Sequence, residues 1–299
     1  MKKALLMGRA FGCPLLLAGS KANIIAPVLA QEILGESVTV NQFTGNGTEF
    51  VPEIHACSLG QTGAHRVDRR GEECVPRTNN GVGLISVEGT LINKGGWIGS
   101  YSGETSYQGL MRQISEARED DDVKAVVFEF DSFGGEVAGC DDCGAAIADL
   151  TAEKPTIAIL TDHAYSAAYW LASQCRTIAL PTLGGAGSIG VIMMHLNVGA
   201  MLERMGQEVT IIASGDRKAD GSPYASLPDS VKEKWQTEAD LIRSDFCAAV
   251  GHGRGKRFGI KSAYATEANT FLGKVAKQMG LVDFVGRPSE IFDGFVEQF

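Results

Sequence analysis

Short apolar runs alternate with helix-like patterns along the chain from residue 82 onward. Five runs rich in apolar and β-branched residues predict strands at 82–87, 123–130, 156–160, 177–180 and 209–212. The run at 123–130 is almost continuously apolar, which is typical of a strand covered on both faces in a parallel sheet. Apolar residues at steps of three and four predict helices at 106–119, 229–250 and 267–279. This alternation predicts an α/β domain.

The first 80 residues show a weaker pattern. Apolar residues between Ile24 and Leu34 have the spacing of a short amphipathic helix. The stretch from Gly35 to Asn80 is polar and glycine-rich without periodicity, which is typical of a linker. We therefore expect an N-terminal arm and irregular linker over residues 1–80 and one α/β domain over residues 81–299.

The extreme N-terminus imitates a secretory signal, since two lysines precede an apolar stretch. Arg9 interrupts that stretch, and the run from Ala10 to Ser20 is shorter than the roughly 20 apolar residues that span a bilayer. We expect an uncleaved start without a stable membrane anchor.

Charge and cysteine content exclude several classes of function. The formal net charge of the 299-residue chain is -9, which gives no electrostatic basis for binding nucleic acid. Seven cysteines, an odd number, argue against a secreted disulfide framework. Cys140 and Cys143 form one isolated Cys-x2-Cys pair inside an expected helix, and no second pair follows at ligand spacing. No metal and no cofactor are expected.

Two serines lie where a nucleophile could be activated. Ser166 follows an expected strand and opens a helix rich in small residues, where backbone N–H groups favour negative charge. An ordinary helix cap explains the same position, and the local sequence alone favours that interpretation. Ser188, in a Gly-Ser-Ile-Gly stretch, has an equally plain alternative as a turn residue.

The candidate bases are Lys218 and His163. Lys218 lies in an expected loop, and a lysine acts as a general base only where burial lowers its pKa from about 10.4 toward neutrality. His163 lies three residues before Ser166, but an isolated loop histidine is more often a surface or packing residue. Gly134 and Gly135 follow the most apolar strand, in a turn that either presents backbone N–H groups to a site or needs glycine only for its conformation.

Taken together, these motifs resemble peptidase family S49, which includes signal peptide peptidase A and the prohead proteases of tailed phages. The resemblance covers roughly residues 82–285. It is carried by 121–127 running into 131–139, then by 164–172, 187–191, 214–221 and 266–283. Residues 9–17 are similar to the start of the phage subgroup. Several ordered motifs are far more specific than any one of them.

The resemblance implies a ClpP/crotonase-like fold, with a parallel sheet core and flanking helices. It implies Ser166 as nucleophile, Lys218 as general base and Ser188 as the group that holds the lysine amine. The oxyanion hole would be formed by backbone N–H groups of the Gly134–Gly135 turn and of Ala167. One departure from the family is Phe133, where the family usually has proline, so the turn is expected to be less rigid.

By the same resemblance, the partners are protein substrates, namely phage scaffold, capsid or portal proteins, and further copies of the chain in a homo-oligomer. The expected location is the prohead, in the host cytoplasm. Because longer phage relatives carry a scaffold region and this chain stops at Phe299, a separate scaffold protein is expected. Three alternatives remain open: a bacterial signal peptide peptidase, a crotonase-type acyl-CoA enzyme and an inactive structural head protein.

Overall fold

The computed structural model describes residues 14–17, 59, 66–67, 73–75, 78, 80–94 and 103–299. The helix expected between Ile24 and Leu34 lies outside these residues. The chain divides into two compact units. The larger unit comprises residues 16–18, 43–190 and 245–299, and the smaller unit comprises residues 1–15, 19–42 and 191–244.

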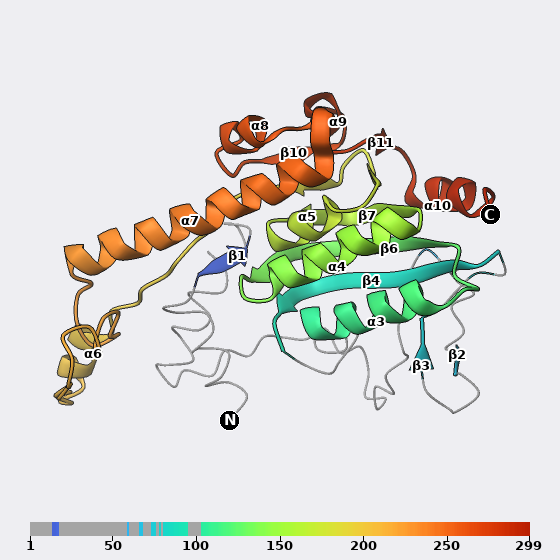
Figure 1. The fold of residues 1–299 in the computed structure, drawn as a ribbon. Coiled ribbons are helices and arrows are strands. Elements are labelled where there is room, and N and C mark those ends of the chain that lie inside the picture. Colours follow the sequence, from blue (N-terminus) through green and yellow to red (C-terminus); the bar gives the residue numbers. More distant parts are fainter. Residues whose placement is uncertain are drawn as a thin grey trace, which may run out of the picture. The chain divides into compact units, whose positions relative to one another are not determined.

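A mostly parallel sheet forms the centre of the larger unit (Figure 1). Its main strand order is β10-β9-β7-β6-β4-β5. Three further strands lie outside this order: β8 pairs with β7, β11 pairs with β8, and β1 pairs with β6. Within this sheet the pairings of β4 with β5 and β6, of β6 with β7, of β7 with β8 and β9, and of β8 with β11 are parallel, whereas β10 pairs antiparallel with β9. The strands are β1 (Leu15–Leu17), β4 (Val82–Ile92), β5 (Glu104–Ser106), β6 (Ala125–Glu136), β7 (Thr156–Tyr165), β8 (Thr177–Leu180), β9 (Gly185–Gly187), β10 (Thr270–Leu272) and β11 (Phe284–Val285). A separate antiparallel pair joins β2 (Arg66–Val67) and β3 (Glu73–Cys74).

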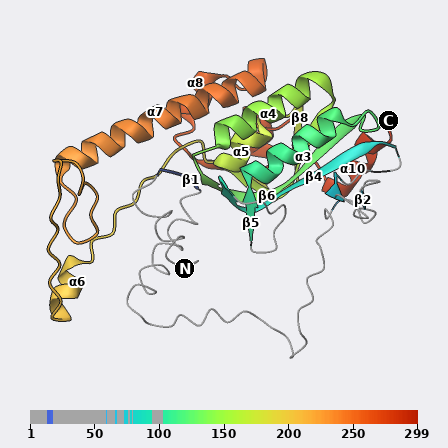
Figure 2. The ribbon, with the colours of Figure 1, turned by 60° about the horizontal axis from the view of Figure 1, so that its bottom comes forward.

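Three helices pack on one face of this sheet: α3 (Tyr107–Glu119), α4 (Cys140–Glu153) and α5 (Ala167–Ala172) (Figure 2). Helix α3 begins where expected, because Ser106 has extended backbone angles and its Oγ accepts a hydrogen bond from the N–H of Gly109. Cys140 and Cys143 are buried in α4, as expected for helix residues. Burial raises the pKa of the Cys143 thiol to about 12, which keeps it protonated and unreactive at neutral pH.

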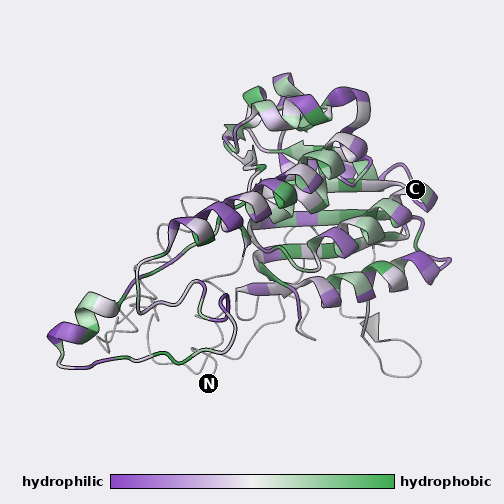
Figure 3. Cartoon of the chain, turned by 60° about the vertical axis from the view of Figure 1, so that its left-hand side comes forward, coloured by the Kyte–Doolittle hydropathy of each residue, from purple (hydrophilic) through white to green (hydrophobic). Residues whose placement is uncertain are grey.

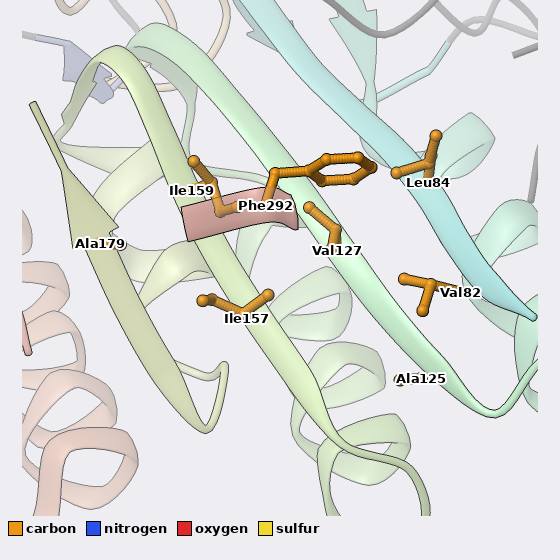
Figure 4. Close-up of a cluster of buried hydrophobic side chains, with 8 residues drawn as sticks. All are labelled: Val82, Leu84, Ala125, Val127, Ile157, Ile159, Ala179 and Phe292. Atoms are coloured by element: carbon orange, nitrogen blue, oxygen red, sulfur yellow. The ribbon is translucent and has the colours of Figure 1, made fainter. Parts of the chain in front are cut away.

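The opposite face is covered by α10 (Pro288–Val296) near the C-terminus. Phe292 of this helix packs onto alternate residues of four neighbouring strands (Figure 4). Those residues are Val82, Leu84, Ala125, Val127, Ile157, Ile159 and Ala179. Burial on both faces explains why these strands read as continuous apolar runs, and Figure 3 shows the same concentration of hydrophobic residues in the sheet. The expected parallel sheet with flanking helices is confirmed.

The remaining helices are α6 (Gly199–Arg204) in the smaller unit, α7 (Asp229–Arg254), the 3-10 turn Gly255–Arg257, α8 (Ile260–Ala265) and α9 (Gly273–Met279). The helix expected at 267–279 is therefore wrong in its first half. Glu267 and Ala268 have positive φ angles of 46° and 57°, which a helix does not tolerate, and residues 270–272 form β10.

The strand expected at Val209–Ile212 is also wrong. These residues have no strand assignment, and the side chain of Ile212 is 95% exposed. β-Branched residues favour a strand only where a neighbouring strand supplies hydrogen bonds and packing. In the part of the chain that the structure describes, no helix is long and apolar enough to cross a membrane.

Candidate active site

Ser166 connects β7 to α5 and has an unusual backbone conformation. Its φ and ψ angles are 54° and -122°, outside the regions that residues with a Cβ normally occupy. Such a conformation costs on the order of 1–3 kcal/mol and persists only where surrounding contacts enforce it. Strained residues of this kind cluster at functional sites.

The helix-cap interpretation of Ser166 is wrong. Although it precedes α5, its side chain makes no capping hydrogen bond, whereas Ser106 does so at the start of α3. The partner of the Ser166 Oγ is the carbonyl oxygen of Gly190, at 3.5 Å, the outer limit of a hydrogen bond. The hydroxyl therefore lies on a strained backbone but does not make the capping hydrogen bond that a serine at the start of a helix usually makes.

The glycine turn at the end of β6 lies against Ser166. Gly134 has a φ of 97°, and a Cβ at this position would lie 3.0 Å from the Cβ of Ser166 and collide with the carbonyl oxygen of Leu16. A Cβ on Gly135 would collide with the backbone of Leu91 in β4. Both positions therefore need glycine, because neighbouring backbone approaches too closely to leave room for a side chain. Ala167 directly follows Ser166 and so lies next to the same turn.

Ser132 positions this turn, and the sequence analysis did not single it out. The buried Ser132 Oγ donates a hydrogen bond to the carbonyl of Gly89 (2.6 Å) and accepts one from the N–H of Gly134 (3.1 Å). The N–H of Gly134 therefore already has a partner. A serine two residues before a glycine turn is a known local hydrogen-bonding pattern, and this was the available signal.

Ser188 is held close to Ser166 through the backbone. The N–H of Ser166 donates to the carbonyl of Gly187 (2.9 Å), and the N–H of Ser188 donates to the carbonyl of Asn269 (2.9 Å). Ser188 also has a positive φ, of 57°, and is buried. The larger unit thus brings together both serines, the glycine turn and Ala167.

Lys218 belongs to the smaller unit. It is exposed, in a turn closed by a hydrogen bond from its N–H to the carbonyl of Gly215 (3.0 Å). It lines an open cavity of about 520 Å³ together with residues 211–214 and 219–222. Its pairing with Ser166 stays a prediction.

His163 has a packing environment. Its ring stacks on Phe133, with centroids 5.1 Å apart, and lies 4.9 Å from the ring of Tyr165. Its Nδ1 lies 3.0 Å from a carboxylate oxygen of Asp162. The phenylalanine that replaces the family's usual proline thus has an aromatic partner, and these contacts favour a packing role for His163.

A small acidic cluster surrounds this histidine. Ligand atoms of Asp131, Asp162 and His163 lie within 4.8 Å of one another. Burial and the neighbouring Asp162 charge raise the pKa of the Asp131 carboxyl. Asp162 is exposed and Asp131 is only partly buried, and such acidic groups commonly meet without an ion, so the cluster is not by itself a metal centre.

Comparison with known proteins supports the sequence resemblance. The model of peptidase family S49 matches residues 148–295, a range that includes Ser166, Ser188 and Lys218. Capsid assembly protease C of Escherichia phage lambda is 33% identical over 280 residues, covering 92% of this chain and 61% of the relative. Head-tail preconnector protein GP5 of Enterobacteria phage P21 is 32% identical over 278 residues, covering 93% of this chain and 54% of the relative.

The chain therefore spans between about half and three-fifths of the length of these two relatives. Among solved structures, the 1510-N membrane-bound stomatin-specific protease aligns with a TM-score of 0.41 and 17% identity, over 71% of this chain and 82% of that one. Residues 148–295 of this chain thus match peptidase family S49, and the two phage relatives extend the similarity over nearly the whole chain.

Proposed function

We propose that the chain is a serine endopeptidase whose nucleophile is Ser166 and whose general base is Lys218. The observation that carries the proposal is the strained, non-capping Ser166 beside a glycine turn that tolerates no side chain. A hydroxyl in a plain structural role would not require such a backbone.

In this mechanism the Ser166 Oγ attacks the peptide carbonyl while the Lys218 amine accepts its proton. The same amine then protonates the leaving amine, and water hydrolyses the acyl-enzyme in a second step. Ser188 holds the lysine amine in place. Because the N–H of Gly134 is already bonded to Ser132, the oxyanion donors are the N–H groups of Gly135 and Ala167.

The base must be desolvated when it acts. Lys218 is exposed within its own unit, so its burial must come from the larger unit or from a second copy of the chain. A homo-oligomer, expected from the family resemblance, supplies such a surface.

We further propose that the substrates are proteins of a phage head. The two phage relatives are named for capsid assembly and for the head-tail preconnector, which supports scaffold, capsid or portal proteins as substrates and the prohead, within the host cytoplasm, as the site of action.

The alternatives are weaker on present observations. The match of residues 148–295 to peptidase family S49 argues against a crotonase-type acyl-CoA enzyme. A signal peptide peptidase acting at a membrane is disfavoured by the two phage relatives. An inactive structural head protein is separated from a peptidase only by activity.

A matched pair of serine substitutions tests the nucleophile. Ser166→Ala should abolish cleavage of head proteins without unfolding the chain, because the Oγ makes no capping bond. Ser106→Ala should preserve cleavage but lower the free energy of unfolding by about 1 kcal/mol, because this serine does cap its helix. Cleavage by Ser166→Ala at the wild-type rate would refute the assignment.

Lys218→Arg tests the base. Arginine keeps the positive charge but does not deprotonate in proteins, so kcat/KM should fall by about 10²–10⁴-fold. If the Lys218→Arg enzyme remains active, Lys218 is not the general base, and His163 becomes the next candidate.

A further inference from the structure

The strand β1 (Leu15–Leu17) lies at the nucleophile. A Cβ added to Gly134 would lie within 3.0 Å of two atoms, the carbonyl oxygen of Leu16 in β1 and the Cβ of Ser166. A peptide carbonyl from the N-terminal part of the chain thus approaches the glycine turn on the same side as the nucleophilic serine.

This strand is held by backbone pairing and by burial. It pairs with β6, the strand that ends in the glycine turn. Leu15 also exchanges two backbone hydrogen bonds with Ile192, of 2.9 and 3.0 Å. The Leu16 side chain is fully buried. Backbone pairing combined with a pocket for alternate side chains is how proteins bind an extended peptide by strand addition.

Ser166 has no exposed surface in this arrangement. Gly134 and Gly135 are buried as well. A substrate carbonyl therefore reaches the Oγ only after some element leaves. The backbones of β4, β7 and β1 all approach the turn, but β4 and β7 are inner strands of the sheet, so β1 is the element that can leave.

We propose that β1 occupies a substrate-binding edge of β6 beyond Ser132, the last β6 residue paired with β7, so that substrates bind there as an extended strand with an aliphatic side chain at the place of Leu16. The chain's own β1 competes with them. The identification of the bound peptide as a substrate rests on the proposed function, but peptide binding itself can be measured without catalysis.

The test measures peptide binding to the full-length Ser166→Ala chain. The probe is a fluorescein-labelled peptide that copies residues 14–20, followed by fluorescence anisotropy. Adding Leu16→Asp to the protein should weaken β1 and tighten binding of the probe by about tenfold or more, because a competing internal strand reduces the fraction of binding-competent protein. A probe with aspartate at the same position should fail to bind.

The control applies the same substitution to an exposed leucine of the larger unit. Leu183→Asp, at a side chain that is 81% exposed, should leave the affinity of the probe unchanged. Circular dichroism verifies folding, and Leu16→Ala replaces Leu16→Asp if the latter unfolds, with a smaller tightening expected.

The proposal that β1 competes with substrates would be overturned if the folded proteins with and without the Leu16 substitution bound the probe equally well, or if neither bound it. If the probe binds as expected while Ser166→Ala still cleaves substrates, the proposed nucleophile is wrong and the binding edge stands.

Discussion

Two serines that begin helices differ in backbone conformation. Ser106 has φ and ψ angles of -94° and 139° and caps its helix, whereas Ser166 has angles of 54° and -122° and does not. Residue type and position are the same, so the difference comes from the surroundings. The backbone of Ser166 is fixed by the pairing of β7 with β9 and by the hydrogen bond of its N–H to Gly187.

Gly134→Ala should reduce catalysis strongly. The added Cβ would need the positive φ of 97° and would meet Ser166 and the Leu16 carbonyl, so the turn must move. We expect kcat/KM to fall by about 10²-fold or more, because movement of the turn would displace the N–H of Gly135, the proposed oxyanion donor, and loss of one such donor costs that much.

Gly103→Ala is the matched control. This glycine has a φ of 73°, but a Cβ would meet nothing within 4 Å, so only backbone strain of about 1–2 kcal/mol is added. Activity should remain. Equal activity of the two folded variants would show that the turn plays no part in the reaction.

At the level of elements, a buried ion pair joins the end of α7 to the sheet. Arg254 is fully buried, and its guanidinium donates to both carboxylate oxygens of Asp283 (2.9 and 3.0 Å) and to the carbonyl of Gly280. Asp283 also accepts the N–H of Ile178 in β8 (2.8 Å). Burial opposes ionisation of Asp283, but the hydrogen bonds and charge of Arg254, the N–H of Ile178 and the charge of Arg257 together outweigh burial and lower its pKa.

Asp283→Ala should lower the free energy of unfolding by about 3–5 kcal/mol at neutral pH, because it leaves the Arg254 charge buried without its partner. Since the pKa of Asp283 is lower in the folded chain, its ionisation stabilises the fold above the unfolded value of about 3.9. That stabilisation disappears as the pH falls through the folded pKa. Urea unfolding at several pH values should show the difference from wild type narrowing in acid.

Glu153→Ala supplies the comparison on the surface. Glu153 pairs with Arg118, and both side chains are nearly half exposed. Its removal should lower the free energy of unfolding far less than Asp283→Ala does, as is usual for exposed pairs. A loss as small for Asp283→Ala would contradict the importance of the buried pair.

At the level of the whole molecule, the smaller unit exposes large apolar side chains, among them Ile212, Leu241 and Met205. Exposed apolar groups of this size are typical of interaction surfaces. They lie in the same unit as the exposed Lys218, whose role as a base requires burial.

If the chain forms the proposed homo-oligomer through this surface, Ile212→Asp should shift it toward smaller species and lower kcat/KM by about tenfold or more. Light scattering after size-exclusion chromatography measures the assembly, and Leu183→Asp in the larger unit serves as the control. If Ile212→Asp changes neither the mass of the assembly nor kcat/KM, this surface contributes to neither assembly nor catalysis. The boundary expected near residue 80 also stays a prediction.

The sequence by itself determined the alternating strands and helices of the larger unit, because burial on both faces demands continuous apolar runs such as 123–130. Its ordered motifs also indicated the similarity to peptidase family S49. Only the tertiary structure decided that Ser166 is strained and does not cap, that 209–212 is not a strand, and that Leu16 lies at the glycine turn. Those properties depend on contacts between residues far apart in the chain, which local propensity and periodicity do not encode.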